Sequence, residues 1–470
     1  MRQTKIVATI GPASREPKVL ERMLAAGVDV ARLNFAHGGP EEHAQTATLI
    51  RDAAERVDRH VAILGDVPGP KLRLGPVEGG VTELHLGSRV VLTPEHVQGT
   101  SDRLPVEWAG LAELVDPGDV CYLADGAIRL RVDEVVDSEI VTNVEVGGAV
   151  ASRQGINLPN VTVSLPAVSE QDLELIEAGL EMGVDAFALS FVRRREDLDP
   201  VRELLQTRDS DAALFAKIEK PQAAANAEEI LDAADGVMIA RGDLGIELPI
   251  EEVPLVQKRI LALAGRRAKP TITATQMLES MVHSKRPTRA EVADVANAIF
   301  DGTDAVMLSQ ETAVGKYPVE AVEMMASIAE TTERDLPYGR WLGERGPQAN
   351  NLYHAISFGA VGAVYQLGLK AVVSPTRTGA TARLISAYRP KAPVLALSPD
   401  LGVVRRCALL WGVRGMVRDE PGETVDLIER CAQAAVEAGL AKAGDTIGIT
   451  AGLPPGRSGG TNLFKVHTVE

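Results

Sequence analysis

Three charged residues near the middle of the chain, Lys217, Glu219 and Asp243, have the types and spacing for chemistry on a phosphorylated substrate. Lys217 and Glu219 end one apolar run, and Asp243 follows the next run after a polar helical segment at residues 221–234. Because side chains alternate along a strand, Lys217 and Glu219 point to the same face. Charges at the end of a buried strand are costly unless they are paired, bind a metal or act in function. This pattern predicts a divalent-cation and phosphate site, with a buried Lys–Glu ion pair as the alternative.

Composition and charge narrow the class of protein. The 470 residues are 45% hydrophobic and 24% charged, as in an ordinary globular protein. The net charge of −16 argues against nonspecific nucleic-acid binding. Cys121, Cys407 and Cys431 share no metal-ligand spacing, which is typical of a reducing cytoplasm. With no signal-peptide core and no apolar run approaching about 18 residues, we expect a cytoplasmic protein with no membrane or nucleic-acid partner.

Strand-like apolar runs alternate with amphipathic segments along the first two thirds of the chain. These runs are residues 4–11, 28–35, 61–67, 186–192, 213–219, 236–240, 270–275 and 305–308. Their number is the one that closes a (β/α)₈ TIM barrel, and a doubly wound open sheet is the alternative. Polar residues gather at the ends of the runs, where barrel enzymes carry their chemistry. We expect a catalytic barrel made of residues 1–69 and 156–335.

Two further parts of the chain do not fit the barrel pattern. Residues 70–155 contain short alternating runs and many glycines, which predicts an inserted small β-barrel domain. Its place at the barrel rim suits a lid that excludes water, and a passive surface domain is the alternative. After a linker-like break rich in Gly and Pro at 334–352, helical patterns alternate with strand-like runs. This alternation predicts an open α/β domain at residues 350–470.

A hydroxyl- and glycine-rich loop follows the first strand of this last domain. It consists of Thr376, Arg377, Thr378, Gly379, Ala380 and Thr381. A loop of this kind at the start of a helix can bind a phosphate group through backbone N–H groups and the helix dipole. A second glycine-rich loop, at residues 452–461 with Arg457, could close over it. An ordinary strand-to-helix turn would look similar.

Sequence blocks in a fixed order along nearly the whole chain resemble the pyruvate kinase family. They lie at residues 9–14 (TIGPAS), 32–35 (RLNF), 157–159 (NLP), 165–170 (LPAVSE), 216–219 (AKIE), 241–245 (RGDLG), 274–281 (ATQMLESM), 286–291 (RPTRAE), 311–313 (ETA), 389–393 (RPKAP) and 461–463 (TNL). The family architecture is a barrel with an inserted β lid and a carboxyl-terminal regulatory domain. The resemblance implies a phosphotransferase (ATP:pyruvate 2-O-phosphotransferase) of glycolysis, which transfers the phosphoryl group of phosphoenolpyruvate to ADP and gives pyruvate and ATP.

The resemblance also implies roles for the charged residues. Glu219 and Asp243 look like ligands of a divalent metal, Mg²⁺ or Mn²⁺. Lys217 would neutralise charge on the moving phosphoryl group and on the enolate oxygen. Arg32 and Arg73 would hold phosphate oxygens through their guanidinium forks.

Other residues are assigned by the same resemblance to the substrate, the proton relay and the nucleotide. The substrate carboxylate would contact the backbone of Ala240, Arg241 and Gly242, with Asp243, and the Thr275 hydroxyl would hold this carboxylate or relay a proton. Ser309 and Glu311 look like members of the relay. The nucleotide would approach Pro12, Asn34, His37 and Arg73. For His37 and Ser309, packing at the barrel rim is the alternative.

Three substitutions predict that activity does not require K⁺. Many family members hold K⁺ at the positions of Asn34, Ala36, Asp66 and Val67, but here Ala36 replaces Ser and Val67 replaces Thr, so two oxygen ligands are lost. Lys71 stands where K⁺-dependent members carry Glu, and its ammonium would supply the missing charge beside Asn34 and Asp66. We therefore expect a requirement for Mg²⁺ but not for K⁺, and a surface position for Lys71 is the alternative.

Further departures from the family pattern leave the nucleotide and the activity open. Pro68, Gln154 and Val314 stand where Lys is common, Ser164 where Asp is common, and Gln310 where Gly is common. A divergent paralogue with another acceptor, a non-catalytic metabolite sensor and a metal-dependent barrel lyase are alternatives. The resemblance also implies a homotetramer with a sugar-phosphate or AMP effector at the loop 376–381, which would act by shifting an equilibrium between subunit arrangements.

Overall fold

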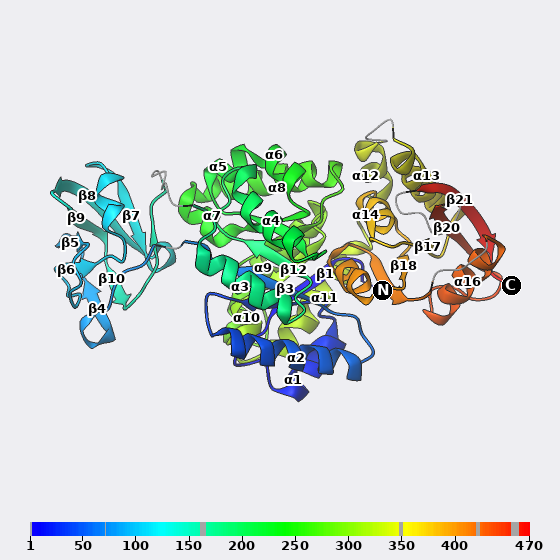
Figure 1. Ribbon diagram of the computed structural model, residues 1–470, viewed down its shortest axis with the longest axis horizontal. Helices are drawn as coiled ribbons and strands as arrows, with labels where there is room; N and C mark the ends of the chain where they lie inside the picture. Colours follow the sequence, from blue (N-terminus) through cyan, green and yellow to red (C-terminus); the bar gives the residue numbers. More distant parts are fainter. Residues whose placement is uncertain (1, 71, 160–165, 347–350, 420–423, 453–459) are drawn as a thin grey trace.

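The structure is a computed structural model that describes residues 2–70, 72–159, 166–346, 351–419, 424–452 and 460–470. Three parts lie in a row, with a β-rich part at one end, a barrel in the middle and an α/β part at the other end (Figure 1). Lys71, Ser164 and Arg457 lie outside the described residues, so the predictions that rest on them are not tested by the structure.

The middle part is a closed barrel of parallel strands, which confirms the TIM barrel and excludes the open sheet for this region. The strands are β1 (Lys5–Thr9), β2 (Val30–Asn34), β3 (Ala62–Val67), β12 (Ala186–Leu189), β13 (Ala213–Ile218), β14 (Gly236–Ala240), β15 (Thr271–Ala274) and β16 (Ala305–Leu308). Their order around the barrel is β1-β16-β15-β14-β13-β12-β3-β2. Both faces of each strand are covered, which explains the nearly continuous apolar runs in the sequence.

Helices surround the barrel and follow its strands. They are α1 (Pro17–Ala26), α2 (Pro40–Arg56), α3 (Glu170–Glu181), α4 (Asp199–Thr207), α5 (Pro221–Ala225), α6 (Ala227–Ala233), α7 (Arg241–Glu247), α8 (Val253–Arg266), α9 (Arg289–Phe300), α10 (Gln310–Ala313) and α11 (Pro318–Glu333). Capping boxes begin α3 at Ser169 and α9 at Thr288. The single helical segment predicted at 221–234 is divided into α5 and α6 at Asn226.

The part between β3 and α3 is built of β-strands with a few 3₁₀ turns, and the sequence predicts its β character. Its strands are β4 (Val81–Leu84), β5 (Arg89–Thr93), β6 (Arg103–Pro105), β7 (Val120–Leu123), β8 (Ile128–Val136), β9 (Glu139–Val146), β10 (Gly148–Ala151) and β11 (Ile156–Asn157). They form a six-stranded sheet, β11-β7-β8-β9-β5-β6, and a two-stranded sheet, β10-β4. Residues 156–157, which the sequence analysis assigned to the barrel, pair with β7 of the insertion. We call this part the lid.

The last part is the expected open α/β domain. Its strands are β17 (Val372–Pro375), β18 (Val394–Ser398), β19 (Val413–Val417), β20 (Thr446–Gly452) and β21 (Thr461–Thr468), in the order β19-β18-β17-β20-β21. Its helices are α12 (Tyr338–Arg345), α13 (Leu352–Leu367), α14 (Ala380–Ala387), α15 (Leu401–Arg406) and α16 (Thr424–Glu437). Helix α12 lies inside the stretch predicted as a linker. That prediction is wrong for 338–345, because Tyr338 and Trp341 are buried in the core.

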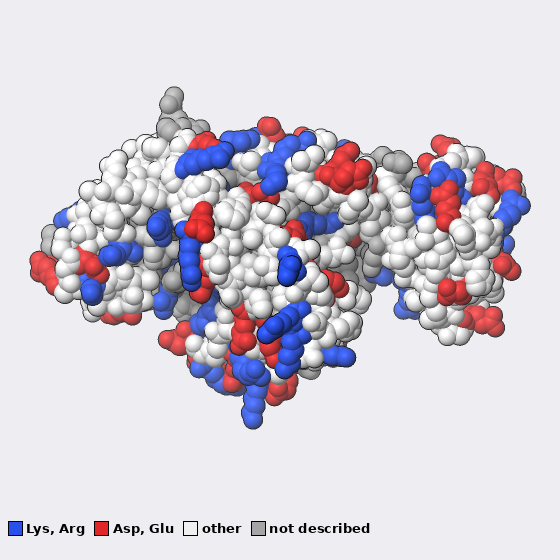
Figure 2. Space-filling view, turned by 180° about the vertical axis from the view of Figure 1, so that it is seen from behind, with Lys and Arg blue, Asp and Glu red and all other residues white. Residues whose placement is uncertain are grey.

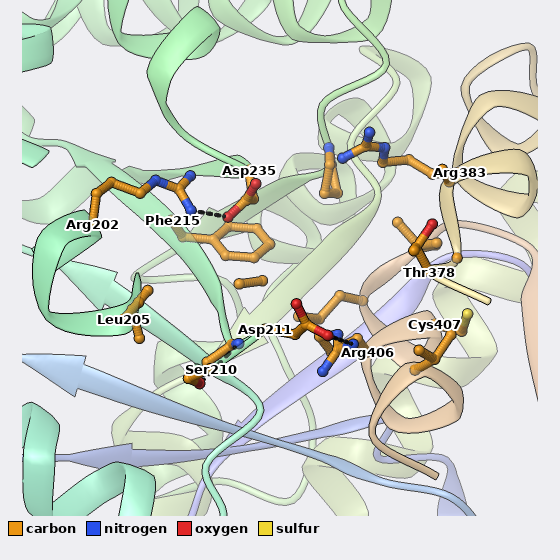
Figure 3. Close-up of a pocket in the computed structure, with 18 of the residues that line it drawn as sticks. Arg202, Leu205, Ser210, Asp211, Phe215, Asp235, Thr378, Arg383, Arg406 and Cys407 are labelled. Atoms are coloured by element: carbon orange, nitrogen blue, oxygen red, sulfur yellow. Dashed lines mark hydrogen bonds and ion pairs between the residues drawn. The ribbon is translucent and has the colours of Figure 1, made fainter. Parts of the chain in front are cut away.

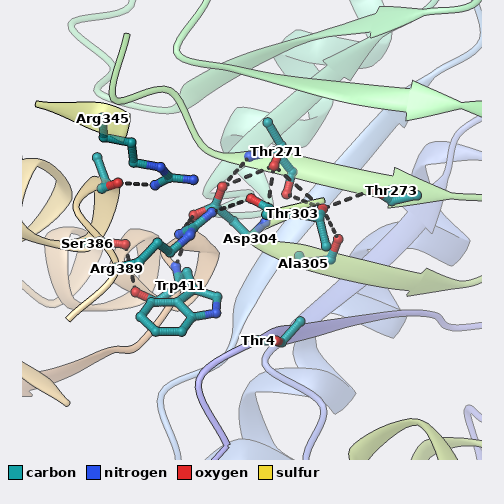
Figure 4. A network of polar contacts seen from close by, with 12 residues as sticks. Thr4, Thr271, Thr273, Thr303, Asp304, Ala305, Arg345, Ser386, Arg389 and Trp411 are labelled. Carbon is teal, nitrogen blue, oxygen red and sulfur yellow. Dashed lines mark hydrogen bonds and ion pairs between the residues drawn. The ribbon is translucent and has the colours of Figure 1, made fainter. Parts of the chain in front are cut away.

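A buried polar network joins this domain to the amino-terminal ends of the barrel strands (Figure 4). Arg389, which is 1% exposed, lies 2.6 Å from Asp304 Oδ1 and donates to the carbonyl of Gly302. Its guanidinium carbon is 5.0 Å from the centre of the Trp411 ring. Asp304 also accepts from the backbone and hydroxyl of Thr271. The two terminal nitrogens of this buried guanidinium are bonded, whereas its Nε has no partner within the described residues, and the pair with Asp304 fixes how the two parts meet.

The surface carries both signs of charge. On the face that Figure 2 shows, acidic and basic side chains are interspersed over the barrel and its neighbours. Within the described ranges, no helix combines the length and the apolar character needed to cross a bilayer.

Candidate active site

Lys217 lies at the carboxyl end of β13 inside the mouth of the barrel. Its Nζ is 2.7 Å from Glu219 Oε1 and 3.1 Å from Asp66 Oδ1, and it donates to Ser190 Oγ at 2.7 Å. Asp66 belongs to β3 and Ser190 directly follows β12, so three neighbouring strands contribute to one cluster. The lysine is only 9% exposed. The sequence analysis named Asp66 only as part of the predicted K⁺ position, and it did not identify Asp66 or Ser190 as partners of Lys217.

The charges in this cluster determine its protonation. Burial opposes the positive charge of Lys217, but Asp66, Glu219 and Asp243 outweigh burial and raise the pKa of the lysine above its ordinary value. Burial raises the pKa of Glu219, and the negative charge of Asp243 acts in the same direction, while Lys217 opposes the shift. The site therefore presents a stable ammonium beside two carboxylates that repel each other.

Glu219 and Asp243 fit a divalent cation, because a metal between them would relieve this repulsion. Asp243 lies in the first turn of α7, next to the carboxyl end of β14. Among the described residues there is no group of three or more His, Cys, Asp and Glu side chains that could hold a metal. A metal bound here would take its remaining ligands from substrate oxygens and water, which suits Mg²⁺.

Arg32 enters the cluster from β2. Its Nε lies 2.7 Å from Asp66 Oδ2, and its Nη1 donates to Thr9 Oγ1 at 2.9 Å. Burial acts to raise the pKa of Asp66, but the positive charges of Arg32 and Lys217 hold it below its usual value. Both oxygens of Asp66 are therefore occupied by cationic side chains. Asn34, at the end of the same strand, accepts from the backbone N–H of Ala36 at 3.2 Å.

A second set of contacts fixes the other oxygen of Glu219. The backbone N–H of Phe191 donates to Glu219 Oε2 at 3.0 Å, with Phe191 in the left-handed region at φ 58°. The Lys220 ammonium lies 5.5 Å from the centre of the Phe191 ring and 2.5 Å from Glu247 Oε1. Glu247 ends α7, which also carries Asp243. The sequence analysis missed Phe191, Lys220 and Glu247, although the short distance of Lys220 from Glu219 along the chain was an available signal.

Thr275 and the start of α7 meet beside the cluster, after β15 and β14, the next two strands of the barrel beyond β13. The Thr275 hydroxyl accepts from the backbone N–H of Gly242 and donates to the carbonyl of Ala274, both at 2.6 Å. Thr275 adopts φ 71°, which turns the chain sharply out of β15. The Arg241 guanidinium binds Asp294 and the carbonyl of Thr275. The backbone of Ala240, Arg241 and Gly242 thus lies beside Thr275, as the proposed substrate contacts require.

Ser309 and Glu311 lie together after β16. One oxygen of Glu311 accepts from the backbone N–H of Ser309 at 2.7 Å, and the other accepts from that of Leu278 at 3.0 Å. Glu311 is fully buried. The Ser309 hydroxyl is buried and has no hydrogen-bond partner among the described residues. Glu311 therefore joins two rim loops, and the Ser309 hydroxyl beside it is left without a partner within the described residues.

A cleft of about 910 Å³ lies between the barrel mouth and the lid. Asp243, Thr275 and Ser309 line its barrel side, and Tyr122 and Arg129 line its lid side. The volume is typical of a site for metabolites of nucleotide size. Sequence reasoning did not identify Arg129, which adds a positive charge to the lid wall.

Arg73 is one of the predicted site residues that the structure does not bring to the cluster around Lys217. It belongs to the lid, donates to the carbonyl of Arg153 at 3.3 Å and does not line the cleft. Pro12 and His37 are exposed in the loops after β1 and β2, and the backbone N–H of His37 donates to the carbonyl of Asn34. The exposure of His37 does not agree with a packing role at the rim.

The loop 376–381 connects β17 to α14. Thr376 Oγ1 accepts from the backbone N–H of Gly379, and the hydroxyls of Thr381 and Thr461 are 2.5 Å apart. Gly379 has φ 81°, a conformation that favours glycine. Thr378, Gly379 and Ala380 line a different cavity, which faces the barrel (Figure 3).

Comparison with known proteins agrees with this architecture. The family model described as "Pyruvate kinase, barrel domain" matches residues 1–322, and the model described as "Pyruvate kinase, alpha/beta domain" matches residues 354–467. A pyruvate kinase of Thermococcus litoralis is 46% identical over 99% of this chain and 98% of its own length. Pyruvate kinases of Geobacillus stearothermophilus and Staphylococcus aureus are 46% and 43% identical over 100% of this chain and 80% and 81% of theirs.

Proposed function

This chain belongs to the pyruvate kinase family, and from that premise we propose that it transfers the phosphoryl group of phosphoenolpyruvate to ADP, giving pyruvate and ATP. Family membership makes it a phosphotransferase. The observation that carries the proposal is the Lys217 ammonium, held between Asp66, Glu219 and Ser190 at the mouth of the barrel. Phosphoryl transfer moves negative charge onto the oxygens of the phosphoryl group and of the leaving enolate. A cation fixed in a buried site stabilises this charge.

Each residue of the cluster has a defined part in the proposed reaction. Lys217 neutralises the phosphoryl oxygens during transfer and the enolate oxygen after it. Arg32, kept in place by Asp66 and Thr9, orients the phosphoryl group from the β2 side. Glu219 and Asp243 would hold a divalent metal, Mg²⁺ or Mn²⁺, which would supply positive charge to the substrate oxygens. Phe191 and Lys220 hold the Glu219 carboxylate in the direction that such binding needs.

The enolate that remains after transfer must take up a proton. The backbone N–H of Gly242 and the carbonyl of Ala274 hold the Thr275 hydroxyl in the cleft, where it can donate its own proton and take one back from water. The unpartnered Ser309 hydroxyl lines the same cleft. Glu311 accepts two backbone N–H groups and keeps the Ser309 loop in position. We assign these residues to a relay with water rather than to a single acid.

The test compares pyruvate release from phosphoenolpyruvate with ADP present and omitted, in the wild type and in Lys217→Met. ADP-dependent release that falls by about 10³-fold or more in Lys217→Met supports the proposal. Lys18→Met, which removes an exposed lysine at α1, is the matched control and should keep full activity. ADP-independent turnover would instead favour a barrel lyase, and no turnover would favour a metabolite sensor or a paralogue with another acceptor.

We also propose that activity needs no K⁺. Ala36 and Val67 offer no side-chain oxygen, and both oxygens of Asp66 are engaged by Arg32 and Lys217. In buffer free of sodium and potassium, added K⁺ should leave the rate nearly unchanged, whereas a large gain would contradict the proposal. Lys71→Glu is the informative variant, because it restores the carboxylate that K⁺-dependent members carry at this position and should make the rate respond to K⁺.

Three further properties stay predictions that follow from the family. They are a homotetramer, a sugar-phosphate or AMP effector at the loop 376–381, and a cytoplasmic location. Sedimentation of the purified chain tests the first. Activation curves with each effector, compared between wild type and Thr376→Val, test the second, because Thr376 fixes the turn at Gly379.

A further inference from the structure

Lys220, which follows the candidate metal ligand Glu219, forms a buried ion pair with the last residue of α7. Its Nζ lies 2.5 Å from Glu247 Oε1, and the side chains of Lys220 and Glu247 are 16% and 2% exposed. A buried ion pair adds little net stability compared with apolar side chains of the same size, so its value lies in the geometry that it fixes. This pair joins the two segments that supply the candidate metal ligands, because α7 also carries Asp243.

The pair reaches the Glu219 carboxylate through Phe191. The Lys220 ammonium lies 5.5 Å from the centre of the Phe191 ring, a distance at which an aromatic face attracts a cation. The backbone N–H of Phe191 donates to Glu219 Oε2 at 3.0 Å, and its φ of 58° is uncommon for a bulky residue. Such a conformation persists only where the surrounding contacts hold it. The contacts of the Phe191 ring therefore help to fix the direction of the Glu219 carboxylate.

Both connections between the lid and the barrel also reach this group. Gly69, where the chain enters the lid, packs so closely on Phe191 that a Cβ atom at residue 69 would lie 2.8 Å from the ring. Asn157 ends β11, which pairs with β7 of the lid, and its side chain is buried beside Glu247. Burial raises the pKa of Glu247, and the charge of Lys220 and the side chain of Asn157 oppose this shift. The entry and the exit of the lid thus contact the residues that position Glu219.

The contact between the lid and α7 is not saturated. Glu247 Oε2 and Asn157 Oδ1 are buried, and neither oxygen has a hydrogen-bond partner within the described residues. Beside them, Gly126 of the lid faces Ile246 of α7, where a Cβ atom at residue 126 would lie 3.3 Å from Ile246 Cγ1. Unsatisfied buried acceptors cost free energy, so a shift of the lid that brings a donor to either oxygen is favourable. The lid side of Glu247 can therefore rearrange, whereas its other oxygen is fixed by Lys220.

We propose that Lys220 and Glu247 are a positioning pair, which holds the Glu219 carboxylate in place for a divalent cation and links it to β11 of the lid. The inference rests on the metal site of the proposed function, and neither residue is assigned a contact with the reacting atoms. A lysine this close to a cation site repels the cation by its charge. Positioning and charge therefore predict opposite effects on cation affinity when Lys220 is removed.

Binding of Mn²⁺ to the full chain without substrates, followed by the electron paramagnetic resonance signal of the free ion, tests the pair. In Lys220→Gln the dissociation constant of Mn²⁺ should rise by about tenfold or more, because residues that orient a metal ligand have effects of this size. An effect of charge alone would lower it. Lys220→Arg keeps the cation beside Phe191 and should recover part of the loss. Lys258→Gln removes a lysine that is 56% exposed and paired with Asp301, and this matched control should bind Mn²⁺ as the wild type does.

A double variant separates positioning from charge and from misfolding. Lys220→Gln alone leaves a buried carboxylate without its partner, whereas Lys220→Gln combined with Glu247→Gln removes both charges. Because the two charges cancel, an effect of charge alone would leave Mn²⁺ binding by the double variant equal to that of the wild type. Loss of positioning should instead weaken it about as much as Lys220→Gln does, since the two residues act as one unit. Thermal midpoints show that each variant is folded before binding is compared.

Hydrogen exchange then tests the link to the lid. Saturating Mn²⁺ should slow exchange of the β11 amides in the wild type, and it should leave their exchange unchanged in the double variant at its own saturating concentration. The proposal is overturned if both variants bind Mn²⁺ at least as tightly as the wild type, or if Mn²⁺ protects β11 equally in the wild type and the double variant. Absence of Mn²⁺ binding by the wild type would overturn it together with the metal site. Normal Mn²⁺ binding without ADP-dependent pyruvate release would refute the proposed function and not this inference.

Discussion

Replacing Asp66 with asparagine is expected to destabilise the barrel at neutral pH and to lower activity. Asp66 holds Arg32 Nε at 2.7 Å and Lys217 Nζ at 3.1 Å, and its own side chain is 3% exposed. Removing one partner of a buried ion pair costs about 3–5 kcal/mol, because the remaining charge is left uncompensated. Lys217 keeps Glu219 and Ser190 as partners, so we expect the low end, about 3 kcal/mol.

The pH dependence of this loss follows from the charge of Asp66. Although burial acts to raise it, the pKa of Asp66 lies below its ordinary value because Arg32 and Lys217 are close. A carboxyl group with a lowered folded-state pKa contributes stability above its unfolded-state pKa, and this contribution is lost as the pH falls through the folded-state value. The difference between wild type and Asp66→Asn should therefore be complete near pH 7 and should shrink below about pH 4.

Scanning calorimetry over this pH range measures the effect. A change of about 3 kcal/mol corresponds to a shift of about 6–12 °C in the midpoint of the barrel transition. Turnover should fall by about 10²-fold, since Lys217 and Arg32 lose part of their orientation. Glu344→Gln breaks an exposed pair with Arg340 and should change stability by less than about 0.5 kcal/mol. If Asp66→Asn matched this control at pH 7, or if its effect did not shrink in acid, the electrostatic reasoning would be refuted.

Three other predictions follow from single features of the fold. Ser309→Ala removes a buried hydroxyl that has no partner within the described residues. In steady-state kinetics its turnover should fall by about 10-fold or more, whereas in calorimetry its thermal midpoint should stay within about 2 °C of wild type. Arg389→Leu leaves Asp304 buried without its ion pair, so the free energy of unfolding should fall by about 3 kcal/mol. The carboxyl-terminal domain should then unfold separately from the barrel, which calorimetry would detect as a second transition. The three cysteine thiols are buried, and burial raises the pKa of each to about 12, so a thiol reagent at pH 8 should react slowly with the native chain and rapidly with the chain in denaturant.

Much of the fold could be predicted because local pattern and burial agree. Strands of a parallel barrel are covered on both faces, so they need the continuous apolar runs that the sequence contains. The alternation of side chains along β13 was enough to place Lys217 and Glu219 on one face, and the structure brings them to 2.7 Å. The stretch around Tyr338 was predicted to be a linker because it is rich in glycine and proline. Tyr338 and Trp341 are nevertheless buried there, and their burial depends on neighbours distant in the chain.

The sequence by itself determined which residue types meet at the barrel mouth, since a strand end and its polar neighbours are local properties. Only the tertiary structure decided that Asp66 and Ser190 are the partners of Lys217, because strand order around the barrel brings together segments far apart in the chain. It also decided that Arg73 lies with the lid, away from the cluster, and that Glu247 of α7 pairs with Lys220. The physical reason is that the packing of separate parts depends on contacts between surfaces, and no spacing along a single chain encodes those contacts directly.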